Sequence, residues 1–154
     1  MTSFTIRPAR PEDKPEWLRM RRILWPDSDE AEFLAELDEL LANAAEQPVF
    51  IALRADQRPG GFLEGGTRKY ADGCETSPVG YIEGWYVDED LRRKGVGGAL
   101  VRAMEDWTRE QGLAEIASDT WLDNETSISA HISLGYIEME RLVHFAKKLH
   151  AKKL

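Results

Sequence analysis

The sequence predicts an α/β fold in which helices cover a mixed β-sheet. Two observations favour it: segments rich in β-branched and aromatic residues alternate with apolar residues at helical spacing, and glycine or proline separates most of these segments. The chain of 154 residues, 42% hydrophobic and 31% charged, has the length and composition of one globular domain with a sizeable core. We therefore expect a single domain over residues 1–154, with the element order β-α-α-β-β-β-α-β-α-β.

The N-terminal third is predicted to form a strand, two helices and a second strand. Thr5–Arg7 is a short strand stopped by Pro8, and Asp13 can cap a helix that runs to about Leu24. Val49–Leu53 is apolar throughout, which is typical of a buried strand. Between these elements lies a second helix whose apolar residues recur at helical spacing, namely Phe33, Leu34, Leu37, Leu40 and Leu41.

The middle of the chain is predicted to form two strands and a helix. Gly61–Arg68 is a strand weakened by its glycines, and Val79–Val87 is a longer strand rich in residues that favour β-structure. A loop over 70–78 connects them. The helix Gly97–Glu110 follows and turns its large apolar residues inward, namely Leu100, Met104 and Trp107.

The C-terminal part is predicted to contain a strand, a helix and a last strand. Glu115–Asp119 is the first of these strands, and Asn124–Leu134 is a helix that ends at Gly135. Tyr136–Phe145 is expected to form the last strand.

The net charge of −8 comes from one segment. Residues 27–46 contain eight acids and no base, whereas the rest of the chain has 20 acids and 20 bases. This balance argues against a nucleic-acid partner, because phosphates require a basic surface. Two interpretations of the acidic segment remain: its field attracts a cationic substrate, or its acids form a solvated helix face.

Composition also bounds the location and the chemistry. No long apolar run could span a membrane, and the N-terminus lacks the apolar core of a secretory signal. The single cysteine, Cys74, excludes an intramolecular disulfide and fits a reducing cytoplasm. We expect no metal site, because His131, His144 and His150 show no metal-ligand spacing.

The loop after Val87 contains the clearest functional motif. A basic triplet, Arg92-Arg93-Lys94, precedes Gly95-Val96-Gly97-Gly98 at the start of a helix. Glycines let a backbone approach an anion closely, and the free N–H groups and dipole of a helix start favour negative charge. The basic side chains add charge-assisted hydrogen bonds. The loop is therefore predicted to bind a pyrophosphate, mostly through its main chain.

Other interpretations of this loop fit less well. A dinucleotide-binding fold requires Gly-x-Gly-x-x-Gly, and Asp119 even lies 22 residues beyond Gly97, but Leu100 occupies the place of the third glycine. A Walker loop is excluded because no Gly-Lys-Ser/Thr occurs. The last alternative is a glycine-rich helix start that merely has arginines on its surface.

The spacing Arg92-x-x-Gly95-x-Gly97, after a strand that ends in Trp85-Tyr86-Val87, resembles the acyl-CoA signature of the GNAT acetyltransferase superfamily. Asn124 and the later Leu134-Gly135-Tyr136 resemble the second motif of that superfamily. The resemblance extends over nearly the whole chain. It implies the GNAT fold, with a mixed, mostly antiparallel sheet flanked by about four helices, and acetyl-CoA as co-substrate.

The sequence is also similar to the chromosomally encoded aminoglycoside 6′-N-acetyltransferases of bacteria. Several of the matching segments are not general acetyltransferase features. These segments are Leu24-Trp25-Pro26, Tyr70-Ala71-Asp72-Gly73-Cys74, Glu83-Gly84, Ala117-Ser118-Asp119-Thr120, Asn124, His131 and Glu140-Arg141.

The resemblance implies cofactor contacts in three parts of the chain. Arg92 to Gly98 would hold the pyrophosphate, and the strand end Trp85-Tyr86-Val87 would hold the pantetheine through main-chain groups beside a splay in the sheet. The N–H of Val87 would point at the thioester oxygen as that oxygen gains negative charge. Asn124 would contact the pantetheine.

Two carboxylates are the candidates for a general base. An ammonium must lose a proton before it attacks a thioester, and a carboxylate within reach can accept that proton. Asp119 matches a family residue that binds the acceptor and is a proposed base, and Glu83 lies on the neighbouring strand. Glu83 precedes Val87 by four residues, so the period of two puts both on one face. Asp119 ranks first and Glu83 second, and the alternative for each is an acid in a cap or salt bridge.

The resemblance also implies the residues that bind the acceptor, a polyamino sugar. Its ammoniums suit carboxylates and its flat faces suit aromatic rings. The implied residues are Trp25, Tyr70, Glu83, Asp119 and Glu140. The alternatives are a core tryptophan at a helix end for Trp25 and an exposed loop tyrosine for Tyr70.

Three further features have open roles. His131 lies where many superfamily members have a tyrosine that protonates the leaving thiolate, and it serves either as that acid or in packing. Gly61–Gly66 and Trp121-Leu122 depart from the family pattern and are candidates for lining the acceptor site.

The predicted function is acetyl transfer from acetyl-CoA to the 6′-amino group of aminoglycosides, with antibiotic resistance as its outcome and no acyl-enzyme. The resemblance implies a homodimer paired through its C-terminal region, with a polycationic small molecule as substrate. Composition and charge predict a cytoplasmic protein with neither nucleic acid nor membrane as partner. One alternative is an acetyltransferase for another cation, such as a polyamine or a protein N-terminus. The other is a non-catalytic acyl-CoA-binding module.

Overall fold

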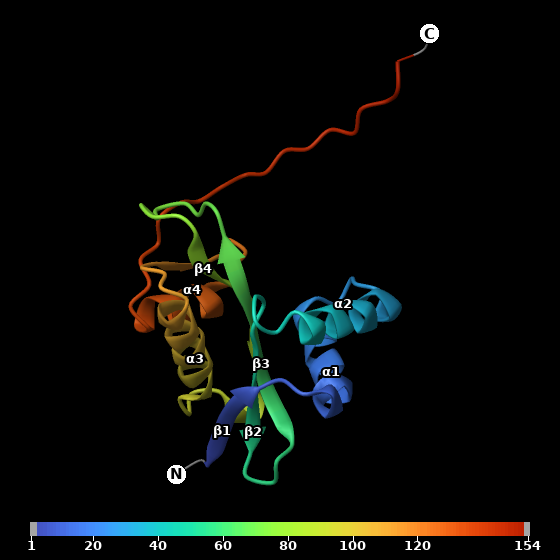
Figure 1. Cartoon of the computed structure of the whole chain (residues 1–154), viewed down its shortest axis with the longest axis vertical. Helices are drawn as coiled ribbons and strands as arrows, with labels where there is room; N and C mark the ends of the chain where they lie inside the picture. Colours follow the sequence, from blue (N-terminus) through green and yellow to red (C-terminus); the bar gives the residue numbers. More distant parts are fainter. Residues whose placement is uncertain (1–2, 153–154) are drawn as a thin grey trace. The chain divides into compact units, whose positions relative to one another are not determined.

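The structure is a computed structural model that describes residues 3–152 (Figure 1). The chain divides into two compact units, Met1–Asp119 and Thr120–Leu154. In the described part of the chain, no helix is long and apolar enough to cross a membrane.

The first unit contains a five-stranded sheet with the strand order β1-β2-β3-β4-β5. Neighbouring strands are antiparallel, except that β4 and β5 run parallel. This arrangement confirms the predicted α/β class and the mixed, mostly antiparallel sheet. The strands are β1 (Phe4–Pro8), β2 (Val49–Arg54), β3 (Pro59–Arg68), β4 (Val79–Val87) and β5 (Ile116–Ser118).

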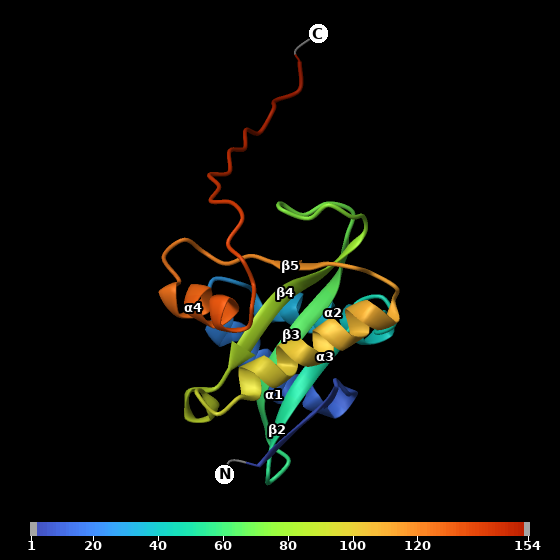
Figure 2. The ribbon, with the colours of Figure 1, turned by 90° about the vertical axis from the view of Figure 1, so that its left-hand side faces the viewer.

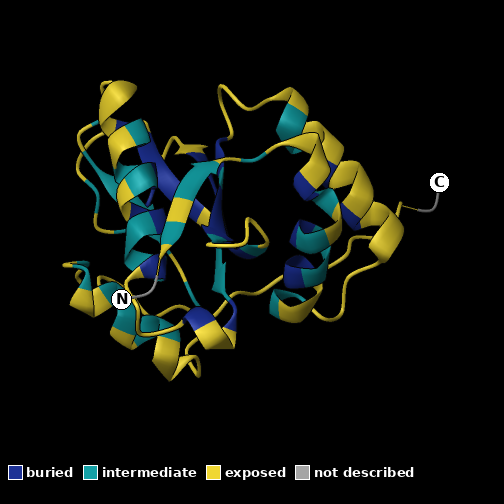
Figure 3. Ribbon diagram, turned by 90° about the horizontal axis from the view of Figure 1, so that it is seen from below, coloured by how far each residue is buried: buried dark blue, intermediate teal, exposed yellow. Residues whose placement is uncertain are grey.

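Helices cover both faces of this sheet (Figures 1 and 2). Helices α1 (Lys14–Leu24) and α2 (Glu30–Ala42) lie on one face, and α3 (Val96–Glu110) lies on the other. Figure 3 shows that buried residues gather in the strands and on the helix faces turned toward them. The core between α1, α2 and the sheet is formed by Trp17, Met20, Leu37, Val49, Ile51, Leu53 and Phe62.

Glycines in β3 allow α3 to lie close to the sheet. A Cβ atom on Gly65 would lie 2.3 Å from Sδ of Met104, and one on Gly61 would lie 3.3 Å from Cδ1 of Leu100. A larger residue at Gly65 would displace the end of the Met104 side chain, which packs from α3 onto β3. The prediction that this glycine stretch lines the acceptor site is therefore wrong for Gly61 and Gly65, which are buried under α3.

Asp13 precedes α1 but does not cap it as predicted. Its carboxylate accepts hydrogen bonds of 2.7 and 2.9 Å from Arg7 and one of 2.8 Å from the N–H of Arg10. A bidentate guanidinium binds a carboxylate more strongly than a helix N–H group does. Asp13 is buried as a result, and it ties β1 to the turn before the helix.

A buried carboxylate on β3 fixes α1 on the sheet. Glu64 accepts hydrogen bonds from Nε1 of Trp17 at 2.9 Å and from Nε and Nη2 of Arg21 at 2.6 Å each. Arg21 and Glu64 are each only 4% exposed. Arg21 also donates to Glu36, so the same guanidinium connects the sheet, α1 and α2.

The acidic segment is partly neutralised by α1. Three of its acids form ion pairs with bases of that helix, so the segment presents less net negative charge to a ligand than its composition indicates. The pairs are Lys14–Asp38, Arg21–Glu36 and Arg22–Glu30.

The second unit contains one helix, α4 (Glu125–Ser133), within its described residues. The side chain of Asn124 caps it by accepting a hydrogen bond of 3.1 Å from the N–H of Ser127. Gly135, with a φ of +92°, follows its C-terminus. The predicted helix is thus confirmed within one residue at each end.

The predicted last strand, Tyr136–Phe145, is wrong. The segment has an apolar alternation, but no described strand pairs with it, so its residues form no ladder. A strand pattern becomes a strand only when a neighbour satisfies its backbone groups. Several large apolar side chains of this segment are exposed, including Ile137, Met139, Val143 and Phe145.

We predict that Glu64→Gln destabilises the protein by about 3–5 kcal/mol, because it leaves the Arg21 guanidinium buried without its main countercharge. Urea unfolding at neutral pH measures this loss. The matched control is Glu36→Gln, which removes the half-exposed partner of the same arginine and should cost less than about 1 kcal/mol. Equal losses of stability in the two variants would show that the buried Glu64 stabilises the fold no more than the half-exposed Glu36 does.

Candidate functional site

The edge of β4 opens where β5 ends. The two strands pair only from Gly80 with Ile116 to Ile82 with Ser118. Beyond Ile82, β4 continues to Val87 with no described strand on that side. Alternate main-chain groups of residues 83–87 therefore face the opening and can bond a ligand. Trp85, Tyr86 and Val87, which were predicted to contact a cofactor, lie on this stretch.

The start of α3 has the features of an anion site. Gly95 precedes the helix with a φ of +82°, a left-handed conformation that favours glycine. No described side chain caps this end, and its first turn contains no acid. The first N–H group of the helix that bonds within it is that of Ala99, to the carbonyl of Gly95 at 3.0 Å. The earlier N–H groups and the helix dipole are therefore directed to a negatively charged ligand.

The basic triplet before this helix contains one arginine that contacts the end of β4 and two cations that are exposed. Nε of Arg92 donates a hydrogen bond of 2.9 Å to the carbonyl of Val87, and its guanidinium lies 5.7 Å from the ring centre of Tyr86. Arg92 thus holds the loop against the end of β4. Arg93 and Lys94 are exposed and form no ion pair with the described residues. Arg93 has a φ of +62°, a conformation that a non-glycine residue adopts at a cost.

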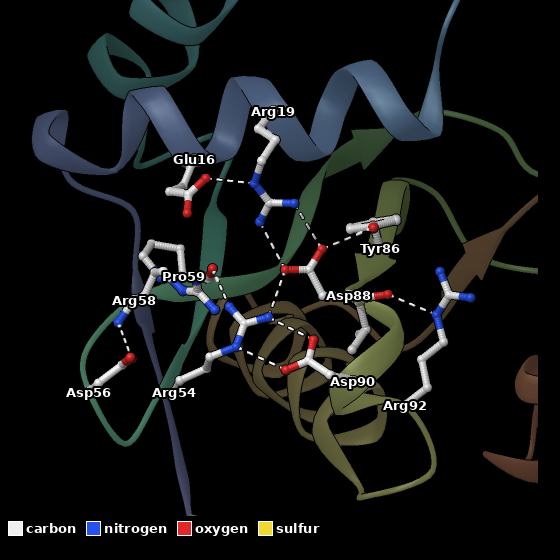
Figure 4. A network of polar contacts seen from close by, with 11 residues as sticks. Glu16, Arg19, Arg54, Asp56, Arg58, Pro59, Tyr86, Asp88, Asp90 and Arg92 are labelled. Carbon is white, nitrogen blue, oxygen red and sulfur yellow. Dashed lines mark hydrogen bonds and ion pairs between the residues drawn. The ribbon is translucent and has the colours of Figure 1, made fainter.

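A buried network fixes the end of β4 just before the loop (Figure 4). Asp88 accepts hydrogen bonds of 2.8 and 3.1 Å from Arg19 on α1 and one of 2.9 Å from Arg54 on β2. The hydroxyl of Tyr86 donates a further bond of 3.0 Å. Burial alone would raise the pKa of Asp88, but the bonds from Arg19, Arg54 and Tyr86 outweigh it and hold that pKa below its ordinary value. Sequence reasoning missed this network, because its members come from three distant segments.

The two candidate bases lie on neighbouring strands. The parallel register pairs Ile82 with Ser118, so the next residues, Glu83 and Asp119, lie at the same level of the sheet. Asp119 accepts a short hydrogen bond from the hydroxyl of Tyr81. Burial, and then this bond, raise the pKa of Tyr81, so the hydroxyl remains a donor at neutral pH. The structure thus brings together the two carboxylates that the sequence singled out.

Glu83 does not follow the simple alternation that was predicted for β4. Gly84 pairs with Glu64 and Ile82 pairs with Gly65, so Glu83 has no partner on β3. One extra residue on one strand is the arrangement of a β-bulge, which redirects side chains and is common beside active sites. The period of two is therefore interrupted between Glu83 and Val87, and the prediction that they share a face loses its basis.

Trp25 lies over β4 next to Glu83. A Cβ atom on Gly84 would lie 2.5 Å from the Trp25 ring, so the glycine allows the ring to contact the strand. Phe33 and Phe62 pack against the same indole, with ring centres 6.2 and 6.3 Å away. The guanidinium of Arg21 lies 5.1 Å from its centre. Trp25 is half-buried, so it packs with the core and also keeps part of its ring at the surface over β4.

Three predicted site residues are not joined to this group by the structure. Tyr70 is 71% exposed on the loop after β3, and its hydroxyl donates a 3.0 Å bond to Asp72. Asn124 and Glu140 belong to the second unit, and their predicted ligand contacts stay predictions. Asn124 has a structural task as the cap of α4.

His131 also belongs to the second unit, where it has packing contacts. Its Nδ1 donates a 2.7 Å bond to the carbonyl of Ser127, and its ring lies edge-on to Tyr136 with centres 5.8 Å apart. No group of three or more His, Cys, Asp or Glu side chains in residues 3–152 could hold a metal ion.

Comparison with known sequences gives consistent matches over nearly the whole chain. The pattern of the Acetyltransferase (GNAT) family matches residues 16–136. Aminoglycoside N(6′)-acetyltransferase type 1 of Klebsiella aerogenes is 42% identical over 150 residues, which cover 96% of this chain and 99% of that protein. The protein of the same name from Stenotrophomonas maltophilia is 44% identical over 146 residues, covering 94% of each chain.

Comparison with solved structures also gives matches to proteins named as aminoglycoside 6′-N-acetyltransferases. The aminoglycoside antibiotic 6′-N-acetyltransferase AAC(6′)-Ih from Acinetobacter baumannii has a TM-score of 0.89 at 34% identity, covering 96% of this chain and 100% of that one. AAC(6′)-Iy, in complex with the bisubstrate analogue CoA-S-monomethyl-acetylneamine, has a TM-score of 0.89 at 33% identity, covering 96% and 99%.

We predict that Asp88 makes the protein sensitive to acid. Because the folded-state pKa lies below the unfolded one, the unfolded state binds the proton more readily, and stability from Asp88 is lost as the pH falls from about 4 through the folded pKa. Asp88→Asn should be less stable at pH 7 and show a shallower loss between pH 5 and about pH 3. Urea midpoints across this range measure the effect. Asp90→Asn, which removes an exposed partner of Arg54, is the control and should change the midpoints less.

Proposed function

This chain belongs to the Acetyltransferase (GNAT) family, and we propose that it transfers an acetyl group from acetyl-CoA to the 6′-amino group of aminoglycosides. The observation that carries the proposal is the arrangement along the open edge of β4. A helix start suited to an anion lies at one end, and the carboxylates of Glu83 and Asp119 lie near the other. The relatives named as aminoglycoside 6′-N-acetyltransferases support the identity of the acceptor.

The residues of the loop fit the pyrophosphate of acetyl-CoA. The uncapped start of α3 offers N–H groups, and Arg93 and Lys94 offer positive charge. A Cβ atom on Gly97 would lie 3.2 Å from the Trp85 ring, so a larger residue there would crowd the helix start. Acetyl-CoA supplies the acetyl group as an activated thioester. The stretch Trp85-Tyr86-Val87 would hold the pantetheine through the main-chain groups that face the open edge, and the N–H of Val87 would donate to the thioester oxygen.

Asp119 is the first candidate for the general base, and Glu83 is the second. An aminoglycoside amine is mostly ammonium at neutral pH, and a carboxylate must take its proton before attack. Both oxygens of Glu83 are held in a two-pronged ion pair by Arg68, at 2.7 and 2.9 Å, so this carboxylate is already engaged with a cation. Asp119 is exposed beside the end of β5 and bonds only a neutral hydroxyl among its described contacts. This difference supports the order of the two candidates.

The acceptor is bound by carboxylates and aromatic faces on the same side. Trp25 offers a half-buried ring over Gly84 of β4, and Tyr70 is on the loop that follows β3. Glu83 and Asp119 bind ammoniums of the sugar, and the assignment of Glu140 as a further acceptor-binding carboxylate rests on the sequence resemblance alone. These assignments extend to this chain what the relatives' names say of their substrates.

The protein acts in the cytoplasm as one domain over residues 1–154, and it forms a homodimer through residues 136–150. Support for the dimer comes from this segment itself, whose Ile137, Val143 and Phe145 are 79%, 74% and 91% exposed. Several large apolar side chains along one segment are rarely left exposed to water unless a partner covers them.

We predict that the full chain sediments as a dimer at micromolar concentration, and that removal of residues 136–154 gives a monomer. The physical reason is the loss of the exposed apolar side chains that the partner would cover. Analytical ultracentrifugation measures both states. A monomeric full chain would contradict the proposal, and circular dichroism of the truncated protein controls for loss of its fold.

We predict that the protein releases thiol from acetyl-CoA when kanamycin or tobramycin is supplied, and that the product is acetylated at the 6′-amine. Thiol release is followed with a chromogenic disulfide, and the position of the acetyl group by NMR. Absence of thiol release with every aminoglycoside at millimolar concentration would contradict the proposal. Release only with spermidine would indicate a polyamine acetyltransferase, release only with peptides an N-terminal one, and CoA binding without turnover a binding module.

The matched variant for this assay is Asp119→Asn, which removes the base but keeps the size of the side chain. Turnover should fall by about 100-fold or more, because general-base catalysis contributes about that much, while the Kd for acetyl-CoA changes little. Equal loss of turnover and of acetyl-CoA binding would point to a folding defect. A larger loss in Glu83→Gln than in Asp119→Asn would reverse the order of the two candidate bases.

A further inference from the structure

Arg68, the last residue of β3, holds a positive charge against the carboxylates of the acceptor side. Its guanidinium donates hydrogen bonds of 2.9 and 2.7 Å to the two carboxylate oxygens of Glu83. The same guanidinium lies 3.6 Å from the ring centre of Tyr81, whose hydroxyl bonds Asp119. The bonds with Glu83 raise the pKa of Arg68, and the charge of Asp119 acts in the same direction. One side chain therefore connects both candidate bases.

The guanidinium occupies the place that a substrate cation requires. A carboxylate has two oxygens with about four lone-pair sites in all, and in the free protein Arg68 takes one site on each oxygen of Glu83. An acceptor ammonium that binds Glu83 must therefore share the carboxylate with the guanidinium or displace it. A neutral sugar cannot replace it, because a hydroxyl brings no charge to compensate for the broken ion pair.

Because the pair is exposed, breaking it costs little free energy. The side chains of Arg68 and Glu83 are 43% and 41% exposed. An ion pair in such a position is weak, because water solvates both charges once they part. By contrast, the pair of Arg21 and Glu64 has both side chains 5% exposed and is not available for exchange. Arg68 also lies at the end of its strand, where the loop 69–78 begins, so its side chain can turn aside without a change in the sheet.

We propose that Arg68 is a specificity-determining residue, which holds Glu83 in the free enzyme and yields it only to an acceptor that brings its own cation. The proposal rests on the proposed function, in which Glu83 binds the acceptor. Arg68 acts as an internal competitor: it weakens the binding of every acceptor that uses Glu83, and it excludes sugars that lack an ammonium there.

The test is the Michaelis constant for tobramycin in Arg68→Ala. Removal of the competitor should lower this KM about two- to fivefold, the range expected for an exposed ion pair. The KM for acetyl-CoA should not change, because Arg68 is remote from the loop that binds the pyrophosphate. Arg68→Lys keeps one charge but loses the two-pronged bond, and it should give an intermediate value.

Two controls separate this role from a general effect of charge. Arg109→Ala removes the same charge from an exposed pair on α3, with Asp106, and should leave the KM for tobramycin unchanged. In a Glu83→Gln background, Arg68→Ala should no longer lower the KM for tobramycin. The carboxylate for which Arg68 and the substrate ammonium compete is absent from that background. Thermal melting of each variant checks that the fold is intact.

The outcomes distinguish this inference from the proposed function. If the wild-type protein acetylates no aminoglycoside, the proposed function is wrong. If the wild type is active but Arg68→Ala leaves the KM for tobramycin unchanged or raises it, only the role of Arg68 is overturned. An equal lowering with and without Glu83 would also overturn it, since Arg68 would then act without that carboxylate.

Discussion

The position of the acceptor side depends on one buried ion pair, between Glu64 on β3 and Arg21 on α1. Glu64 is bound by two nitrogens of Arg21 and by the indole N–H of Trp17. These bonds fix the orientation of α1 about its own axis and its position along the sheet. The guanidinium of Arg21 then lies 5.1 Å from the Trp25 ring and 4.8 Å from the Phe33 ring. Because Trp25 directly follows α1, its contact with β4 at Gly84 is a consequence of that pair. A charge buried to this extent stabilises the fold only with its partners complete, which makes it a constraint on geometry as much as a source of stability.

Strand β4 transmits this constraint to the rest of the site. Its partner β5 ends at the level of Ile82, the bulge at Glu83 redirects the strand, and Asp88 fixes its end through Arg19 and Arg54. Arg19 belongs to the same helix as Arg21. Helix α1 therefore reaches both ends of the open edge: Trp25, directly after the helix, packs against Gly84, and Arg19 bonds Asp88 before the loop that starts α3.

Local patterns in the sequence predicted the elements but not the long-range contacts. Val79–Val87 was predicted without error because a strand of β-forming residues is a local signal, and the loop from Arg92 to Gly98 was recognisable because its glycines and bases are consecutive. Asp13 was misassigned because its true partner, Arg7, lies on another element. Tyr136–Phe145 has a strand pattern, but whether it pairs depends on a neighbour that the pattern does not specify. The bulge at Glu83 and the partner Arg68 depend on the register of two strands, which no single segment encodes.

The two ends of the open edge differ in how they meet a ligand, and this difference has a consequence for specificity. At the start of α3, no described side chain caps the helix and the exposed Arg93 and Lys94 form no described ion pair, so an anion would gain these contacts without breaking an ion pair. At the other end, Glu83 is paired with Arg68, and Asp119 with Tyr81, so an acceptor must exchange one interaction for another. Binding by exchange depends on small differences between ligand and internal partner, and side chains such as Arg68 can alter those differences without affecting the backbone. Under the proposed function, such a fold would keep one cofactor site, formed mostly by main chain, while a few exposed side chains would set its choice of amine.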